Sequence, residues 1–202
     1  MHIFSVVSDP LAAGIFWASF YFWFFVFETW VSLRNARTPS PLSYTDKRSA
    51  LFLLIAFYVG IFSALAAAFL VPRFSLEKTG THTMLFLGGI FLLWVGIALR
   101  LWSVRTLGKY FRTLVLVRPD HELIIAGPYR YLRHPAYTGS LLSVFGFALA
   151  LDNRLSLVVV ALTIFPAYLW RIHVEEEVLK KHFPDTYLSY AQKTRRLIPF
   201  VW

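Results

Sequence analysis

Cysteine is absent from this 202-residue chain, and charged residues make up only 15% of it. Without cysteine, neither a disulfide nor a thiol nucleophile is available. A soluble domain is usually about one quarter charged, so this composition argues against one. The six histidines show no HExxH or comparable ligand spacing, so we predict no metal site. No glycine-rich turn follows a predicted strand, which excludes a dinucleotide-binding fold.

Long apolar runs dominate what is present, because 57% of the residues are hydrophobic. A transmembrane helix needs about 20 mostly apolar residues. Five runs approach this length, at residues 11–33, 50–71, 84–104, 137–151 and 155–170. The sequence therefore predicts an all-α, polytopic integral membrane protein with about five transmembrane helices. The last two runs are short, so buried or re-entrant helices are an alternative for them. Only residues 152–154 separate these two runs, which predicts a tight antiparallel hairpin.

The basic residues indicate what the protein meets and how it is oriented. There are 20 Lys and Arg against 11 Asp and Glu, a formal net charge of +9. Because the basic residues lie between apolar runs, we expect them to contact membrane lipids with anionic headgroups, and we expect no nucleic acid partner. Most of them follow the first, third and fifth runs, whereas the opposite loops hold only Arg73, Lys78 and Arg154. The positive-inside rule then predicts an outside N-terminus and a cytoplasmic C-terminus, in a plasma, inner or endoplasmic reticulum membrane. The first ten residues contain no basic region or evident cleavage site, so we expect no cleaved signal peptide.

Two ionisable residues lie within the apolar runs. Glu28 is near the end of the first run, where it either serves a function or simply reaches the interface. Arg100 lies inside the third run, and we expect its side chain to snorkel towards the cytoplasmic side. The many aromatic residues of the first two runs are typical of lipid-facing bulk, with a binding site as the alternative.

The segment 127–139, GPYRYLRHPAYTG, is unusually polar and rigid for such an apolar chain. Gly127 and Pro128 indicate a turn. Pro135 disfavours a helical backbone at His134, so Arg133 and His134 are predicted to be extended at the mouth of the fourth run. In a membrane, such a backbone is tolerated only where protein or a water-filled cavity satisfies it. The alternative is a membrane-surface turn whose Arg and Tyr side chains anchor in the headgroups.

A second polar segment, residues 170–199, is predicted to continue the fifth helix. Arg171 and Glu175 are four residues apart and share a helix face, with Glu176 beside them. The alternative is an exposed helix with Arg171–Glu175 and Glu177–Lys181 ion pairs. Three adjacent carboxylates at a membrane boundary require a cation, because anionic lipid repels them. Arginines of the first polar segment or a cationic ligand are the candidates.

Taken together, the motifs resemble those of the isoprenylcysteine carboxyl methyltransferase family, integral membrane enzymes that use S-adenosylmethionine. The matching patterns, all within about residues 105–200, are H-x-L-[VI] from His121, G-x-Y-x-x-x-R-H-P-x-Y-x-G from Gly127, R-x-x-x-E-E-x-x-L-x-x-x-F from Arg171, Y-x-x-Y from Tyr187 and R-x-I-P from Arg196. Two positions depart from the family. Phe183 is followed by Pro184 instead of glycine, where we expect the same helix break, and residues 114–120 lack a cofactor-contacting glutamine.

The resemblance implies a methyltransferase that acts on a lipophilic acceptor at the cytoplasmic face. It implies one membrane domain, residues 1–202, in which residues 1–104 form three helices and residues 105–202 form the cofactor-binding and catalytic half. The cofactor pocket would be lined by His121, Glu122, Leu123, Ile124, Tyr129, His134, Pro135, Ala136, Tyr137 and Glu175. The catalytic residues would be Arg171, Glu175, Glu176 and Arg133. Carboxylates and aromatic faces suit the positive sulfonium of the cofactor, and Arg171 suits an acceptor carboxylate.

Several alternatives stay open at this stage. The acceptor is a prenylcysteine carboxylate by resemblance, but a phospholipid amine or a small thiol is possible within the same superfamily. An amine would have to lose a proton, and His134 or a glutamate is then the candidate base. The protein is otherwise a non-catalytic membrane scaffold or a transporter subunit. We predict no obligate protein partner.

Overall fold

The computed structural model describes residues 10–36, 46–71, 74, 82–111 and 123–198. The described residues contain helices and no named strand. The helices are α2 (Pro10–Tyr21), a π-helical segment η1 (Phe22–Phe27), α3 (Glu28–Ala36), α4 (Lys47–Leu70), α5 (His82–Leu107), the 3-10 turns η3 (Gly108–Tyr110) and η4 (Gly127–Arg130), α6 (Pro135–Ala150), α7 (Arg154–His182) and α8 (Pro184–Lys193).

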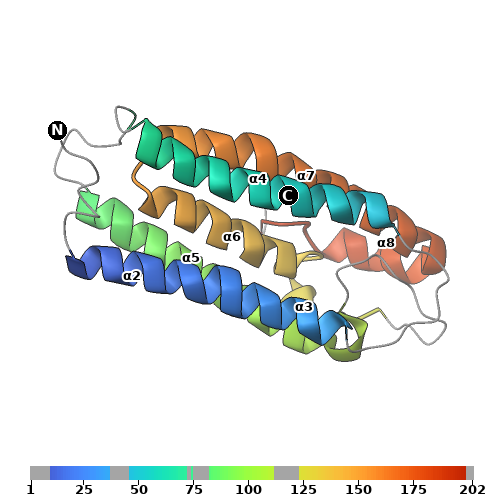
Figure 1. Ribbon diagram of the computed structural model, residues 1–202. Coiled ribbons are helices and arrows are strands. Elements are labelled where there is room, and N and C mark those ends of the chain that lie inside the picture. The colour runs from blue at the N-terminus through green and yellow to red at the C-terminus, as the bar shows by residue number, and fades with distance from the viewer. Residues whose placement is uncertain (1–9, 37–45, 72–73, 75–81, 112–122, 199–202) are drawn as a thin grey trace.

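The long helices run side by side, with α8 at one end of the bundle (Figure 1). Helix α6 lies between α5 on one side and the α4–α7 pair on the other. Four helices are long and apolar enough to cross a membrane, namely Pro10–Leu33, Lys47–Leu70, Thr83–Tyr110 and Arg154–His182. The prediction of an all-α integral membrane protein is therefore confirmed. Helix α6 spans 16 residues, about 24 Å at 1.5 Å per residue, and most of its residues are buried. It is the short, central helix of the bundle.

Glycines bring α5 and α6 into backbone contact. A Cβ placed at Gly96 would lie 2.4 Å from the carbonyl oxygen of Gly139, and one at Gly89 would lie 2.5 Å from the backbone nitrogen of Ala150. Small residues at such crossings are the usual device for helix association in membranes, where water does not drive helices together. The hydroxyl of Ser143 on α6 also donates to the Leu93 carbonyl of α5 at 3.1 Å. These contacts hold α6 at one position along α5.

Helix α7 packs against α4 and begins at the predicted hairpin. Asn153 caps α7, because its side chain accepts a hydrogen bond from the Ser156 backbone at 3.2 Å. The hydroxyl of Ser156 then donates to the Ala64 carbonyl of α4 at 2.7 Å. Helix α6 ends at Ala150 and α7 starts at Arg154, which confirms the tight connection between the last two apolar runs.

Aromatic rings join the first helix to the rest of the bundle. Phe20 stacks on Phe147 of α6 with ring centroids 5.1 Å apart, and the fully buried Trp23 lies 5.8 Å from the same ring. Other rings of this helix, such as Tyr21 and Phe25, point outward. The aromatic residues are thus divided between the core and the apolar outer surface.

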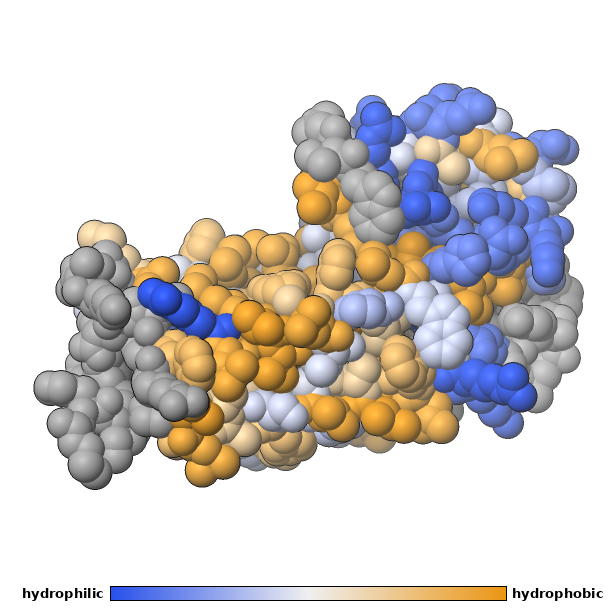
Figure 2. Space-filling view, turned by 90° about the horizontal axis from the view of Figure 1, so that it is seen from above, coloured by the Kyte–Doolittle hydropathy of each residue, from blue (hydrophilic) through white to orange (hydrophobic). Residues whose placement is uncertain are grey.

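The surface separates the apolar helices from a polar end. Figure 2 shows apolar side chains along the length of the bundle and hydrophilic ones gathered towards one end. That end carries α8 and the last turns of α7, where Lys180, Lys181 and Lys193 lie. We call it the α8 end.

Arg100 does not snorkel, contrary to our prediction. Its side chain is only 10% exposed, and its Nη2 donates to Glu28 Oε2 at 3.0 Å. Its Nη1 donates to the Ser140 hydroxyl at 2.5 Å. The interior of the bundle supplies an anion and a hydroxyl, so the guanidinium is stabilised there instead of at the headgroups. Neither of the two roles considered for Glu28, a function or a position at the interface, includes this pairing: the structure places its carboxylate against Arg100, with 23% of the Glu28 side chain exposed.

Candidate active site

The polar turn between η4 and α6 adopts the predicted non-helical backbone. Gly127 has φ +56°, and a Cβ there would lie 2.9 Å from the Thr106 hydroxyl, so glycine is required twice over. Pro128 lies in the first turn of η4. His134 has φ −126° and ψ 52°, and α6 starts at Pro135. The local sequence thus fixes where α6 begins and which way His134 faces.

The chain segment after α8 satisfies this turn. The backbone N–H groups of Arg133 and His134 donate to the carbonyls of Arg195 and Arg196 at 2.7 and 3.1 Å. The Thr138 hydroxyl donates to the Leu197 carbonyl at 2.8 Å. Two segments more than fifty residues apart therefore pair their backbones at the α8 end, and protein supplies the hydrogen bonds that water supplies elsewhere.

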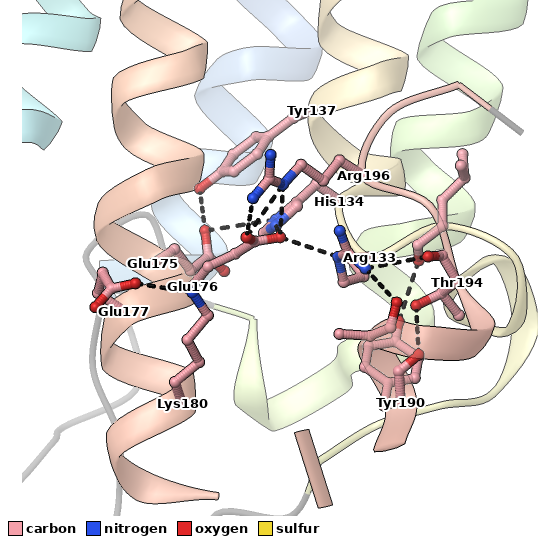
Figure 3. A network of polar contacts seen from close by, with 12 residues as sticks. Arg133, His134, Tyr137, Glu175, Glu176, Glu177, Lys180, Tyr190, Thr194 and Arg196 are labelled. Carbon is pink, nitrogen blue, oxygen red and sulfur yellow. Dashed lines mark hydrogen bonds and ion pairs between the residues drawn. The ribbon is translucent and has the colours of Figure 1, made fainter. Parts of the chain in front are cut away.

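Glu176 lies at the centre of a buried charge cluster (Figure 3). Its Oε1 accepts from Arg133 Nε at 2.9 Å and lies 3.4 Å from His134 Nε2. Its Oε2 accepts from Arg196 Nη2 at 2.9 Å. Only 5% of the Glu176 side chain is exposed. The expectation that arginines of the first polar segment compensate the carboxylates is met here by Arg133.

Glu175 occupies a different environment, although it is the adjacent residue. The Tyr137 hydroxyl donates to Glu175 Oε2 at 2.7 Å, and His134 Nδ1 lies 4.0 Å from the same oxygen. The rings of His134 and Tyr137 stack with centroids 5.6 Å apart. The Glu175 side chain is 31% exposed. A carboxylate with two aromatic rings beside it and an accessible face is suited to receiving a cation.

Arg171 is almost fully buried one helical turn before Glu175. Its Nε donates to the Tyr137 hydroxyl at 3.4 Å, and its Nη1 donates to the Ser49 hydroxyl at 2.7 Å. The same Nη1 lies 3.6 Å from Asp46 Oδ2. Sequence reasoning missed Asp46 and Ser49. An Asp before an apolar run signals a helix N-cap, but nothing local shows that it also faces α7.

Asp46 caps α4 and holds Arg171 at the same time. Its carboxylate accepts from the Ser49 backbone at 3.3 Å and from the Ser49 hydroxyl. Burial acts to raise the pKa of Asp46, but the Ser49 hydrogen bonds and the Arg171 charge outweigh it and hold the pKa below its usual range. Asp46 is therefore charged when it meets Arg171.

Helix α8 is anchored to the same turn. Arg133 Nη1 donates to the carbonyls of Ala191 and Thr194 at 2.7 and 3.0 Å, which closes the end of α8. The Tyr190 hydroxyl donates to the Tyr129 carbonyl at 2.7 Å. Burial raises the pKa of Tyr190 far above its usual range, against the opposing charge of Arg133, so this hydroxyl stays a donor. The predicted helix break also occurs, because α7 ends at His182 and α8 begins at Pro184.

The predicted site residues are only partly brought together. Arg133, His134, Tyr137, Arg171, Glu175 and Glu176 converge at the α8 end. Tyr129, Pro135 and Ala136 are buried in the adjoining turn, whereas Leu123 and Ile124 are half-buried. His121 and Glu122 lie outside the described residues. The exposed-helix alternative paired Glu177 with Lys181. In the structure, Glu177 pairs instead with Lys180 at 2.8 Å.

Comparison with known proteins matches this architecture. The profile of the family described as phospholipid methyltransferase matches residues 84–186, which is just over half of the chain. The chain belongs to the phospholipid methyltransferase family. The match begins in α5 and extends into α8, so it includes the whole polar turn and the three glutamates.

The chain is also similar to proteins named protein-S-isoprenylcysteine O-methyltransferase. Protein-S-isoprenylcysteine O-methyltransferase B of Arabidopsis thaliana is 33% identical over 115 residues, covering 56% of this chain and 58% of that protein. The Saccharomyces cerevisiae protein-S-isoprenylcysteine O-methyltransferase is 32% identical over 144 residues, covering 70% of this chain and 60% of that protein. The chain spans about three fifths of the length of these curated relatives.

A solved structure supports the same fold for this family member. The eukaryotic intramembrane Ras methyltransferase, an isoprenylcysteine carboxyl methyltransferase, superposes with a TM-score of 0.58 at 26% identity. The alignment covers 73% of this chain and 52% of that protein. The predicted resemblance to isoprenylcysteine carboxyl methyltransferases is confirmed, and so is the assignment as an integral membrane protein.

Proposed function

We propose that the protein is an S-adenosylmethionine-dependent methyltransferase that modifies a lipophilic acceptor, most like a protein-S-isoprenylcysteine O-methyltransferase. The observation that carries this is the contrast between two adjacent carboxylates. Glu176 is enclosed by Arg133, Arg196 and His134, whereas Glu175 keeps an accessible face beside two aromatic rings. The cluster thus leaves one carboxylate available for a positive ligand.

The residues present suit the cofactor. When bound, S-adenosylmethionine supplies an electrophilic methyl group on a positively charged sulfonium. Glu175 would face the positive charge, and the stacked rings of His134 and Tyr137 would line its side. The turn containing Tyr129, Pro135 and Ala136 would enclose the cofactor, together with the segment 121–124 named in the sequence motifs.

Arg171 is proposed to orient the acceptor. It lies one helical turn from Glu175 towards the middle of α7, and its Nε already touches the Tyr137 hydroxyl. A guanidinium there favours an anionic acceptor group and holds it in a fixed direction. A carboxylate acceptor is nucleophilic at neutral pH, so the protein needs only to align the reactants and exclude water.

Arg133 and Glu176 are proposed to position the site. Their mutual ion pair joins the start of α6 to α7, and Arg133 also closes α8. Their catalytic assignment stays a prediction. In the structure, polar atoms of both side chains bind protein partners. This supports a structural contribution to the site.

A lipid amine is the second candidate acceptor, because the matching family is described by phospholipid methylation. An amine must lose a proton before or during methyl transfer. His134 is the proposed base, since its Nε2 lies 3.4 Å from Glu176 Oε1 and its Nδ1 lies 4.0 Å from Glu175 Oε2.

The proposed orientation places the N-terminus outside and the α8 end in the cytoplasm. Basic residues concentrate at the α8 end, as the positive-inside rule requires, and they would contact anionic lipid headgroups. A water-soluble cofactor would then meet a membrane-dissolved acceptor at this end.

The test uses full-length protein in lipid nanodiscs, with labelled S-adenosylmethionine offered alongside a prenylcysteine analogue or phosphatidylethanolamine. We expect a base-labile product from the prenylcysteine analogue, as an ester requires. A base-stable product from the phospholipid would favour the amine reading. No transfer, together with no binding of S-adenosylhomocysteine at about millimolar ligand, would contradict the enzyme reading and favour a scaffold or transporter subunit.

Neighbouring glutamates provide the matched variants. Glu175→Gln is expected to weaken the binding of S-adenosylmethionine, which carries the sulfonium charge, by about tenfold, equivalent to about 1.4 kcal/mol. Glu177→Gln makes the same substitution two positions later, at a residue paired with exposed Lys180, and should leave the affinity as it is. Equal affinity in both variants would remove Glu175 from the cofactor site. Arg171→Ala should mainly impair acceptor use.

A further inference from the structure

A second ion pair lies inside the bundle and is not used by the proposed chemistry. Arg100 of α5 and Glu28 of α3 are joined at 3.0 Å, and Arg100 is buried. At 1.5 Å per residue, Glu28 and Arg100 both lie about 27 Å along their helices from Pro10 and His82. Arg171 lies about 26 Å from the start of α7. These three helices run in the same direction along the bundle (Figure 1).

Arg100 is connected to the first turn of α6. Its Nη1 donates to the Ser140 hydroxyl at 2.5 Å and reaches the Ala136 carbonyl at 3.5 Å. The Ser140 hydroxyl donates to the same carbonyl at 3.1 Å. A Cβ at Gly139 would lie 2.7 Å from the Arg100 backbone nitrogen, so the two helices touch at this level. Arg100 therefore holds the residues on both sides of Tyr137.

Tyr137 connects the Glu28–Arg100 ion pair to the candidate site. Its hydroxyl donates to Glu175 at 2.7 Å and accepts from Arg171 at 3.4 Å. Its ring packs edge-on against Tyr168 of α7, with centroids 5.4 Å apart. A small rotation of the first turn of α6 would move the hydroxyl away from Glu175, because the two groups are on different helices.

The first helix is wound unusually where it delivers Glu28. The six residues before it, Phe22–Phe27, form a π-helix, a rare conformation that often occurs at functional sites. A π-helical turn contains more residues than an α-helical one, so the segment changes the direction in which Glu28 projects. Trp23 and Phe24 within it are buried, which holds the segment in place.

We propose that Glu28 and Arg100 form a positioning pair that fixes the start of α6 and thereby holds the Tyr137 hydroxyl against Glu175. The proposal deepens the proposed function, since it depends on Tyr137 and Glu175 facing the cofactor. An apolar pair would join the helices as firmly, because buried ion pairs contribute little net stability. Ionisable residues within membrane helices are costly and usually mark function. Within the described part of the chain, Arg100 Nε has no hydrogen-bond partner, so the guanidinium is directed by Glu28, by Ser140 and by the Ala136 carbonyl.

The test follows Tyr137 directly. 3-Fluorotyrosine is placed at position 137 alone, and its ¹⁹F resonance is recorded in nanodiscs for the parent protein, Glu28→Gln and Ser140→Ala. Both substitutions conserve most of the side-chain volume. Glu28→Gln leaves the buried Arg100 without its anion, whereas Ser140→Ala keeps the ion pair, so the second variant tests the proposal even where the first is destabilised. We expect both to shift the resonance, and Glu28→Asp to restore part of the parent position. Glu177→Gln, the control with the same charge change, should leave the resonance where it is.

Kinetics provide the second measurement. A misplaced hydroxyl should lower kcat by about 10- to 100-fold, while the acceptor KM changes by no more than about twofold, since Arg171 keeps its contacts with Ser49 and Asp46. An unchanged resonance and an unchanged kcat in Glu28→Gln and Ser140→Ala would overturn the proposal. The ion pair would then only link the two helices structurally. If the parent protein transfers no methyl group, the proposed function fails, but the position of the ¹⁹F resonance still decides the role of the pair.

Discussion

Three consecutive glutamates in α7 have three different surroundings. Glu175 accepts from Tyr137 and keeps an accessible face, Glu176 is buried among cations, and Glu177 pairs with Lys180 at the surface. Successive helical residues point about 100° apart, so neighbours in the sequence face different parts of the protein. The same substitution at each position should therefore give a distinct result.

Glu176→Gln should destabilise the protein. Removing its charge leaves Arg133 and Arg196 facing an amide in a buried cluster, and breaking such a pair costs about 3–5 kcal/mol. Thermal unfolding in detergent measures the change. Glu177→Gln, the adjacent control, should unfold close to the parent temperature. Similar melting curves for both variants would show that the cluster is not a structural centre.

Asp46→Asn separates two roles of one residue. Asparagine remains a good helix cap, so α4 should persist, but the negative charge beside Arg171 is lost. We expect the acceptor KM to rise several-fold, because Arg171 is less firmly oriented, while cofactor affinity is retained. Titration of both ligands measures this, and a weakened cofactor with normal acceptor use would contradict it.

The pH dependence of stability offers a check on the same residue. Folding lowers the pKa of Asp46, so its contribution is complete above the pKa of an unfolded aspartate and is lost as the pH falls through the folded value. Between about pH 7 and pH 3, the difference in unfolding temperature between parent and Asp46→Asn should shrink. A difference that stays constant would show that Asp46 is not charged in the folded protein.

Helices α5 and α6 set the frame on which the site depends. Their glycines permit backbone contact, and Arg100, Ser140 and Tyr137 lie along the same contact. Apolar runs predicted where both helices occur, and Pro135 predicted where α6 starts. Which glycines face a partner and which face outward could not be predicted, because every glycine in a run of apolar residues has the same local signal.

Gly139→Ala tests this contact. A Cβ there would lie 2.7 Å from the Gly96 carbonyl and from the Arg100 nitrogen, and backbone atoms cannot move aside cheaply. Overpacking of this kind costs about 1–3 kcal/mol. Gly88→Ala is the matched control, since a Cβ there meets nothing within 4 Å. Unfolding in detergent should separate the two variants, and equal stability would show that the helices are farther apart than described.

On the scale of the whole molecule, polarity is arranged along the bundle axis. Apolar surface covers the helices, and hydrophilic side chains gather at the α8 end (Figure 2). The hairpin between α6 and α7 lies at the opposite end (Figure 1). An enzyme that joins a soluble cofactor to a membrane-dissolved acceptor requires such an arrangement, with its polar end in the compartment that holds the cofactor.

Single cysteines can establish the orientation, because the chain has none of its own. Gln192→Cys places a thiol on exposed α8, and Arg154→Cys places one at the exposed start of α7. In sealed vesicles with the cytoplasmic face outward, a membrane-impermeant maleimide should label position 192 but not position 154. The reverse pattern would invert the proposed topology.

Sequence alone determined the class of this protein, its helical runs and the motifs that place it in its family. These follow from composition and spacing, which act over one helix or one turn: an apolar run of sufficient length must be helical in lipid, and a proline fixes the next helix start. Tertiary structure alone decided that Asp46 pairs with Arg171 and that Arg100 turns inward to pair with Glu28. It also decided that the chain after α8 accepts the backbone hydrogen bonds of the turn at His134. Each of these contacts joins residues far apart in the chain, and a buried charge selects whichever opposite group the packing brings within reach.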